Sequence, residues 1–522
     1  MFKKIILILL IYSLILSCKS NTLRFDEELT DPYLWLEEVM DENALNWVKE
    51  QNKRTSDLLE GTESFEELEN GLLDILNSKE RIPYVKKCGL YYYNFWKDDE
   101  NPRGIWKRTT FEEYKKGQAK WEIILDIDKL GKEEGVSWVW NEAKILKPQC
   151  KLALIYLSRG GADANVIREF DIEKKEFVKE GFQIPEAKGE MSWIDKNSIY
   201  VATDFGDNSL TNSGYPRIVK LWERGTSIEE AKVIFEGEKK DIEVGAYYDD
   251  TKGFERHFVY RMISFYESEL FLLEKSGKLK RIEIPIDAKV SVHREWLLVE
   301  LRKPLKIKDE IYKEGSLLAI KFEEFINGKK DFKVIFEPTQ KTSLYSYDWT
   351  LNYLVLNVLD NVKNRIFVID PKNDFEREEL KVGSGFSTLN LWAVDEQESD
   401  DLFITLNDFI TPTTLYLYEI RKELEKLKQT PAFFDSSNFE ISQHFAISKD
   451  GTSIPYFKVS KKGLILDSSN KTLLTGYGGF EYSNLPYYSG VIGYGWLKKG
   501  ASLLLQIFAE EVNMVQNGIN QL

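Results

Sequence analysis

After its N-terminal segment, the chain divides into two parts that differ in the spacing of their hydrophobic residues. Residues 25–75 carry apolar residues at helical spacing, with Ala44, Trp47 and Val48 at positions i, i+3 and i+4 of one helix face. Residues 76–435 carry short runs of β-branched and aromatic residues separated by turn residues, which is typical of strands. The pattern predicts a helical segment followed by a long all-β region.

The β region is too long to be a single sandwich. Runs such as Lys151–Leu157, Trp296–Leu301 and Leu354–Val358 recur along it with few helical periods between them. About 350 residues divided among seven four-stranded blades leave about 50 residues for each blade, which fits a β-propeller. No crisp repeat fixes the number of blades, so the number seven comes from a family resemblance described below.

Residues 1–18 have the pattern of a bacterial lipoprotein signal peptide. Lys3 and Lys4 precede the apolar run Ile5–Leu16, which is too short to span a bilayer. The run leads to Ser17 and Cys18, where a lipoprotein would be cleaved and lipidated on the cysteine. We expect a lipid-anchored protein of the cell envelope, outside the cytoplasm. An ordinary signal peptide with an incidental cysteine is the alternative.

Composition narrows the possible ligands. The chain is 43% hydrophobic and 30% charged with a net charge of −15, which indicates a soluble globular protein and argues against binding nucleic acid or an anionic lipid surface. None of the three histidines lies at ligand spacing from another histidine or a cysteine, so we expect no metal and no other cofactor. A disulfide is permitted in the envelope, but Cys88 and Cys150 lie near apolar runs and are predicted to be buried thiols.

The Gly-rich stretch Thr475–Phe480 follows the apolar pair Leu473 and Leu474, and its glycines permit a sharp turn. Phe445–Val459 precedes this turn and Gly495–Gly500 follows it. In this order the segments resemble the opening strands of the peptidase domain in the prolyl oligopeptidase family of serine peptidases.

The resemblance implies a mainly β fold. It implies a seven-bladed β-propeller over residues 76–435 and the first strands of an α/β-hydrolase domain over residues 436–522. Residues 25–75 resemble the family's N-terminal segment, which packs on the peptidase domain. Tyr477 would supply the oxyanion-hole hydroxyl and Phe480 would line the proline pocket. The expected partners are short proline-containing peptides, which the propeller of the family admits while it excludes folded proteins.

The catalytic residues of that family are missing from the chain as written. The nucleophile of such an enzyme lies in a G-x-S-x-G elbow and is followed by an Asp and then a His, but no G-x-S-x-G occurs in the sequence. His257, His293 and His444 all precede the Gly-rich turn, whereas the catalytic histidine should come last. We therefore predict that the chain as written does not cleave peptides.

Residues 506–520 are compatible with a shift of the reading frame near Gly500. In the frame one base upstream, Ala509 permits only Arg or Cys, Met514 permits only Tyr or His, and Val515 must become Gly. These choices recover the Arg-Gly-Gly-Gly-Glu-Tyr-Gly string that follows this position in the family. The shift could belong to the gene or to its sequencing.

A non-catalytic propeller lipoprotein that binds peptides or a partner protein is the alternative function. In the truncated domain we expect the apolar runs Leu473–Leu474, Val491–Ile492 and Leu503–Leu505 to stay exposed, because the helices that cover a mostly parallel sheet would be missing.

Overall fold

The computed structural model describes residues 31–38, 41–477 and 483–506, and the chain forms two compact units, residues 1–71 and 72–522. In the first unit, the 3-10 turn η1 (Leu34–Glu37) precedes helix α2 (Glu42–Leu59). Helix α3 (Glu63–Leu76) begins in this unit and continues into the second. The helical prediction is confirmed for the described residues, and none of their helices is long and apolar enough to cross a membrane.

Helix α2 begins where its sequence supplies a cap. The carboxylate of Asp41 accepts hydrogen bonds from the backbone N–H groups of Asn43 and Ala44, which satisfies donors that the first helical turn leaves unpaired. The ring of Trp35 meets the ring of Trp47 edge to face, with 6.2 Å between their centroids.

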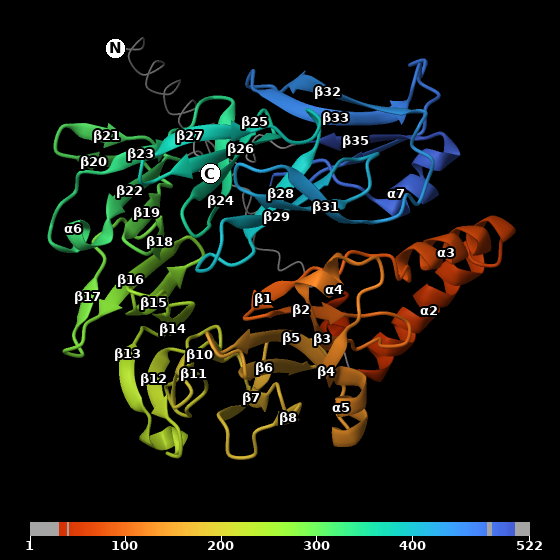
Figure 1. Cartoon of the computed structure of the whole chain (residues 1–522). Coiled ribbons are helices and arrows are strands. Elements are labelled where there is room, and N and C mark those ends of the chain that lie inside the picture. Colours follow the sequence, from red (N-terminus) through yellow and green to blue (C-terminus); the bar gives the residue numbers. More distant parts are fainter. Residues whose placement is uncertain (1–30, 39–40, 478–482, 507–522) are drawn as a thin grey trace, which may run out of the picture. The chain divides into compact units, whose positions relative to one another are not determined.

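The described part of the second unit contains seven antiparallel sheets, six of four strands and one of five, each built from strands that are consecutive or nearly so (Figure 1). Blade 1 is β1 (Lys86–Cys88), β2 (Tyr91–Trp96), β3 (Ile105–Thr110) and β4 (Glu122–Asp126). Blade 2 is β5 (Trp138–Ile145), β6 (Leu152–Arg159), β7 (Asn165–Asp171) and β8 (Glu176–Phe177), with β9 (Gln183–Ala187) also paired to β7. Blade 3 is β10 (Glu190–Asp195), β11 (Ser198–Ala202), β12 (Ile218–Glu223) and β13 (Lys232–Glu236). Blade 4 is β14 (Glu243–Asp249), β15 (Arg256–Ser264), β16 (Glu267–Leu273) and β17 (Leu279–Arg281).

The other blades follow the same plan. Blade 5 is β18 (Lys289–His293), β19 (Trp296–Glu300), β22 (Leu317–Lys321) and β23 (Lys333–Phe336), and the hairpin of β20 (Leu305–Ile307) and β21 (Glu310–Tyr312) interrupts it. Blade 6 is β24 (Thr342–Trp349), β25 (Leu354–Asp360), β26 (Lys363–Asp370) and β27 (Glu376–Leu380). Blade 7 is β28 (Thr388–Ala393), β29 (Asp401–Asn407), β30 (Thr414–Glu419) and β31 (Leu424–Gln429). Short helices lie in the connections: α4 (Phe111–Lys115), α5 (Ile127–Glu134), η2 (Ile228–Glu230) and α6 (Phe322–Ile326).

Buried hydrophobic clusters join each blade to the next and close the ring. Six clusters of described residues lie between consecutive blades from 1 to 7. A seventh joins the ends, with Tyr92 and Tyr114 of blade 1 packed together with Phe403 and Leu415 of blade 7. The first strands of neighbouring blades also touch, as β10 touches β14 and β24 touches β28. The first strands therefore line the axis of a seven-bladed propeller, as predicted.

The strand β25 shows why the hydrophobic runs are continuous instead of alternating. Leu354 and Leu356 point into the cluster shared with blade 5, whereas Val355 points into the cluster shared with blade 7. Successive side chains of a strand face opposite sides of the sheet, so a blade packed on both sides needs apolar residues at every position.

A mixed sheet follows the propeller. Its order is β32 (Phe439–Ile447), β33 (Ser453–Lys461), β35 (Ser502–Gln506) and β34 (Thr472–Thr475). The first two pairings are antiparallel and the pairing of β34 with β35 is parallel. Helix α7 (Gly490–Gly495) and the turn η3 (Leu497–Lys499) lie between β34 and β35.

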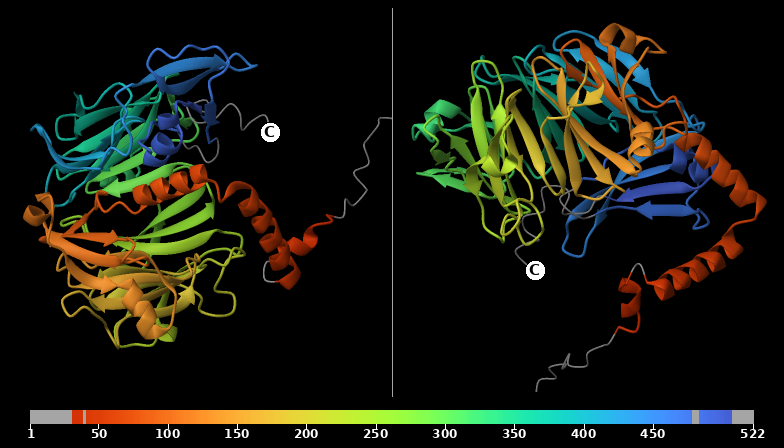
Figure 2. Two further views of the ribbon diagram at one scale, coloured as in Figure 1. Left: turned by 90° about the vertical axis from the view of Figure 1, so that its right-hand side faces the viewer. Right: turned by 90° about the horizontal axis from the view of Figure 1, so that it is seen from below.

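The prediction that the apolar runs of this sheet stay exposed is wrong for Leu503–Leu505. Leu503 and Leu505 are each 3% exposed, and with Phe457 they form a cluster that includes Leu359 of blade 6 and Phe409 of blade 7. The end of the propeller covers this face of the sheet, so its burial does not depend on further helices (Figure 2). Leu473, Leu474 and Val491 are exposed, as predicted, but Ile492 is partly buried against the same cluster.

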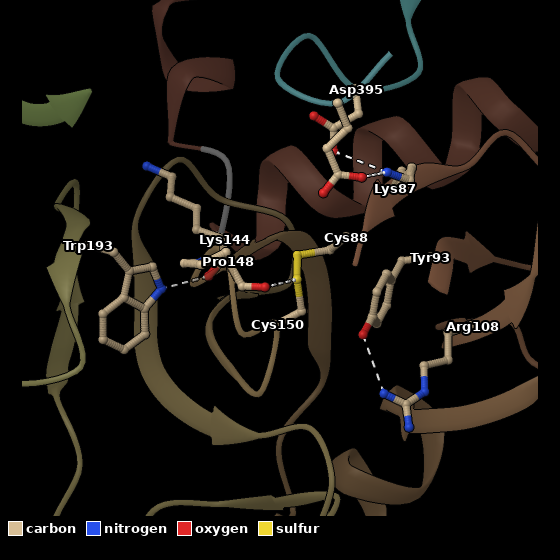
Figure 3. Close-up of a disulfide and its surroundings, with 10 residues drawn as sticks. Lys87, Cys88, Tyr93, Arg108, Lys144, Pro148, Cys150, Trp193 and Asp395 are labelled. Carbon is tan, nitrogen blue, oxygen red and sulfur yellow. Dashed lines mark hydrogen bonds and ion pairs between the residues drawn. A yellow bond between two sulfur atoms is a disulfide. The ribbon is translucent and has the colours of Figure 1, made fainter. Parts of the chain in front are cut away.

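The prediction that Cys88 and Cys150 are free thiols is also wrong. The two residues form a disulfide with 5.9 Å between their Cα atoms (Figure 3). Cys88 ends β1 and Cys150 lies in the connection from β5 to β6, so the bond joins blade 1 to blade 2. Both cysteines are buried, as expected, but it is the packing of blade 2 on blade 1 that places them side by side.

Candidate functional site

Tyr477 lies directly after β34, in the Gly-rich turn. Tyr477 is 50% exposed, and its carbonyl oxygen accepts a hydrogen bond of 2.8 Å from the side-chain amide of Asn484. That bond joins the beginning of the turn to the segment that follows it. Phe480, the predicted proline-pocket residue, and Cys18, the predicted lipidation site, lie outside the described residues.

The segment after the turn is fixed on the propeller side. The hydroxyl of Tyr488 accepts a hydrogen bond of 2.8 Å from the backbone N–H of Phe433, and its ring stacks on Phe434. Burial raises the pKa of Tyr488, so the phenol stays protonated. Ser489 then caps α7 by accepting a hydrogen bond from the N–H of Ile492.

The turn therefore belongs to a sheet that packs on one mouth of the propeller. The propeller residues in the shared cluster include Leu359 near the end of β25, Val362 between β25 and β26, and Phe409 between β29 and β30. All three lie where a second strand passes to a third, and because the blades repeat one topology around the ring, such connections share one end of the axis.

A polar network crosses the first strands of blades 2, 3 and 4. The Lys144 ammonium on β5 lies 2.7 Å from one carboxylate oxygen of Glu190 on β10, and the Tyr260 hydroxyl donates a 2.6 Å hydrogen bond to the other. Burial acts to lower the pKa of Lys144, but Tyr156 and Glu190 outweigh it and raise that pKa. Burial, and then Glu190, raise the pKa of Glu243 on β14.

Glu142 on β5 also lies 3.6 Å from the Lys144 ammonium, so the network has three carboxyl groups for one ammonium and suits the N–H groups or positive charge of a ligand. Sequence reasoning missed it. Its members come from separate blades, and no local motif connects them.

The three histidines do not form a catalytic constellation. His257 shares a 2.8 Å hydrogen bond with the Tyr200 hydroxyl, and His293 stacks on Trp349. The Nε2 atom of His444 lies 2.8 Å from the Ser442 hydroxyl on the same strand, but no carboxylate of the described residues lies within ion-pair distance of that ring. A serine–histidine pair without an orienting acid lacks the third member of a triad. Nor do the described residues include three metal-ligating side chains grouped as a metal site.

Comparisons with known proteins identify the architecture. The family model "Prolyl oligopeptidase, N-terminal beta-propeller domain" matches residues 19–431. An uncharacterized peptidase, y4nA, of Sinorhizobium fredii is 35% identical over 93% of this chain and 68% of its own length. A prolyl endopeptidase of Elizabethkingia meningoseptica is 27% identical over 91% of this chain and 65% of its own.

A solved structure agrees with these relatives. The post-proline cleaving enzyme from Rickettsia typhi superimposes with a TM-score of 0.84 at 32% identity, over 91% of this chain and 71% of that enzyme. The chain thus spans about two thirds of the length of the proteins that it matches. Sequence family, ring of seven blades and mixed sheet lead to one assignment: the chain belongs to the prolyl oligopeptidase family.

Proposed function

We propose that this protein derives from a post-proline cleaving peptidase and that the 522 residues given bind short proline-containing peptides without cleaving them. The observation that carries the proposal is the match to a post-proline cleaving enzyme across nine tenths of the chain. The propeller would admit short, extended peptides from the mouth at which the β32–β35 sheet is packed. The polar network around Glu190 would meet their N–H groups.

Tyr477 is the candidate oxyanion donor. Tyr477 follows β34 and is half exposed. The hydrogen bond from the Asn484 side chain to its carbonyl oxygen fixes its backbone. A phenol in this position would donate to the oxygen that becomes negative when a peptide carbonyl is attacked. Phe480, three residues further along, would contact the proline ring.

The packing of the β32–β35 sheet supports a folded binding protein. Phe457 is completely buried between this sheet and the propeller, so the first hydrolase strands are already part of a common core. A nucleophile would still be required for hydrolysis, and the sequence given holds no G-x-S-x-G elbow.

Binding and cleavage are separable in one set of assays on residues 19–522. We expect a fluorescein-labelled tetrapeptide with a central proline to bind more tightly than its alanine counterpart, as measured by fluorescence anisotropy. Neither peptide should be hydrolysed, and no serine should react with a proline phosphonate. Equal affinity for both peptides would contradict the binding proposal, whereas a labelled serine would contradict the absence of a nucleophile.

The shifted frame is tested by reading the coding DNA around the Gly500 codon again. If the longer frame is present, the longer protein should cleave after proline. Tyr477→Phe should then lower kcat by about 10²–10³, the usual cost of losing one oxyanion donor. An unchanged kcat would remove Tyr477 from the mechanism.

For the location, we propose that Cys18 carries a lipid that holds the protein on the cell envelope, outside the cytoplasm. The apolar run Ile5–Leu16 and the cysteine that follows it support this proposal. Cys18→Ala should leave the membrane fraction or accumulate with its signal uncleaved, which fractionation and immunoblotting would detect. Normal processing with unchanged membrane attachment would rule out the anchor.

A further inference from the structure

The connection between β28 and β29 of blade 7, residues 394–400, contacts other blades beyond its neighbours. The side-chain amide of Gln397 donates a 2.9 Å hydrogen bond to a carboxylate oxygen of Asp250, just after β14 of blade 4. The carboxylate of Glu396 lies 3.7 Å from Nδ1 of His293, at the end of β18 of blade 5.

On the other side of the ring, the same connection reaches blade 1. The ammonium of Lys87 on β1 pairs with the carboxylates of Asp395, at 3.5 Å, and Glu398 (Figure 3). Lys87 precedes the disulfide-bonded Cys88, so the strand that carries this ammonium is tied covalently to blade 2.

These partners require the connection to lie across the axis. In a ring of seven blades, blade 4 is as far from blade 7 as any blade can be. A direct side-chain hydrogen bond between the two is therefore possible only if residues 394–400 extend over the central tunnel. In Figure 1 the connection before β29 runs toward the middle of the ring.

The covered mouth is the one away from the β32–β35 sheet. Asp250 and His293 lie where a first strand passes to a second, at β14–β15 and β18–β19. The cluster that holds the sheet uses the opposite connections, from second to third strands. Residues 394–400 and the sheet thus lie at the two ends of the tunnel.

The base of the connection is fixed as well. The carboxylate of Asp400 accepts hydrogen bonds from the Thr350 hydroxyl at 2.8 Å and from the backbone N–H of Asn352 at 2.7 Å, both in blade 6. Within the connection, the carboxylate of Asp395 accepts a 3.0 Å hydrogen bond from the N–H of Gln397. A segment held at its base and at its tip has a defined position and does not behave as a loose loop.

We propose that residues 394–400 are a plug that closes the tunnel mouth opposite the β32–β35 sheet to solutes of peptide size. Peptides then enter the tunnel only from the side of the sheet. The contacts of Gln397 with blade 4 and of Glu398 with blade 1 hold the plug shut. This inference concerns access to the propeller and holds whether or not the chain binds or cleaves peptides.

A single thiol beneath the plug reports whether it is closed. In residues 19–522 the native cysteines are joined to each other, so His293→Cys introduces one free thiol at the position that faces Glu396. Gln397→Ala combined with Glu398→Ala removes the tip contacts, and both of these side chains are exposed enough to be replaced without damage to the core. Labelling by a maleimide that carries a poly(ethylene glycol) chain should become about tenfold faster in the combined variant.

The matched control is Glu337→Ala in the same His293→Cys background, because it removes an exposed ion pair with Lys313 away from the plug. It should leave the labelling rate unchanged. Equal labelling rates with and without the tip contacts would overturn the proposal.

A cross-link tests the position of the plug without the change at His293. In Asp250→Cys with Gln397→Cys, a short bismaleimide should join the two thiols, each of which adds across one maleimide double bond with no leaving group. Mass spectrometry of a tryptic digest should then find the linked peptides. The two single variants should give none. Failure of the double variant to cross-link would also overturn the proposal, since the side chains would not meet across the axis.

Discussion

His293 combines burial with a neighbourhood of mixed charge. Its ring stacks on Trp349 with centroids 4.7 Å apart, and burial, followed by the charge of Arg294, lowers the pKa of His293 to about 4. Asp249 acts in the opposite direction and Arg256 in the same direction, while Glu396 of the plug faces Nδ1 at 3.7 Å. The imidazole therefore remains neutral in the folded protein at pH values where a free histidine is charged.

This shift makes stability depend on pH in a defined window. Above pH 6.5 the imidazole is neutral in both states, so its contribution is fully present. As the pH falls from 6.5 to about 4, the unfolded chain binds a proton that the folded chain does not, and the free energy of unfolding decreases. His293→Phe keeps a neutral ring against Trp349, and should reduce the loss of stability across this window by about 3 kcal/mol.

Urea denaturation of the wild type and His293→Phe at several pH values measures this difference. Burial raises the pKa of Glu396, and the stability that follows from that shift is lost as the pH rises, which is opposite in direction to the effect of His293. Phe445→Leu, on β32, is the control: it changes an exposed side chain that carries no titratable proton and should keep the wild-type pH dependence. If His293→Phe loses stability toward acid as steeply as the wild type, His293 is not the group responsible.

At the scale of elements, the features that could be predicted are those that depend on residues close together in the sequence, such as strands and helix caps. The apolar run Leu354–Val358 predicted a strand, and the structure has β25 there; the cap of α2 likewise comes from a neighbouring residue, Asp41. The disulfide of Cys88 and Cys150 could not be predicted in this way. Their 62-residue separation gives no indication that β1 and the β5–β6 connection are neighbours in the ring.

The exposure predicted for Leu503–Leu505 of β35 is wrong for the same reason, because local sequence does not show which distant segments meet. Leu503 and Leu505 belong to a strand whose apolar face requires cover, and the sequence predicted only that some cover was needed. Which element supplies it depends on how the sheet meets the propeller, through Phe409 and Leu359. The same holds for the candidate site. The Gly-rich turn indicated Tyr477 from the sequence, whereas the Glu190 network and the plug become visible only when the blades are arranged in the ring.

At the scale of the whole molecule, the propeller and the β32–β35 sheet of the second unit share one hydrophobic core. One hydrophobic cluster includes residues of blades 6 and 7, of the strands β32, β33 and β35, and of the connection between β34 and β35. Phe457 on β33 is fully buried at its centre, and its ring lies 5.9 Å from that of Phe409 in blade 7. The sheet and the propeller should therefore resist proteolysis together.

Limited proteolysis of residues 19–522 should leave a core that continues past residue 435 and retains most of 439–505, because cleavage there first requires Phe457 and its neighbours to leave the cluster. Phe457→Ala should cost about 3–5 kcal/mol of local stability. It should release the β32–β35 segment to proteases while the propeller, held by its own seven clusters, remains intact. Phe445→Ala is the matched control, since Phe445 lies on β32 of the same sheet but is 50% exposed. Mass spectrometry of the fragments shows where each protein is cut. If the wild type is cleaved between residues 436 and 500 as fast as Phe457→Ala, the cluster does not hold the sheet to the propeller.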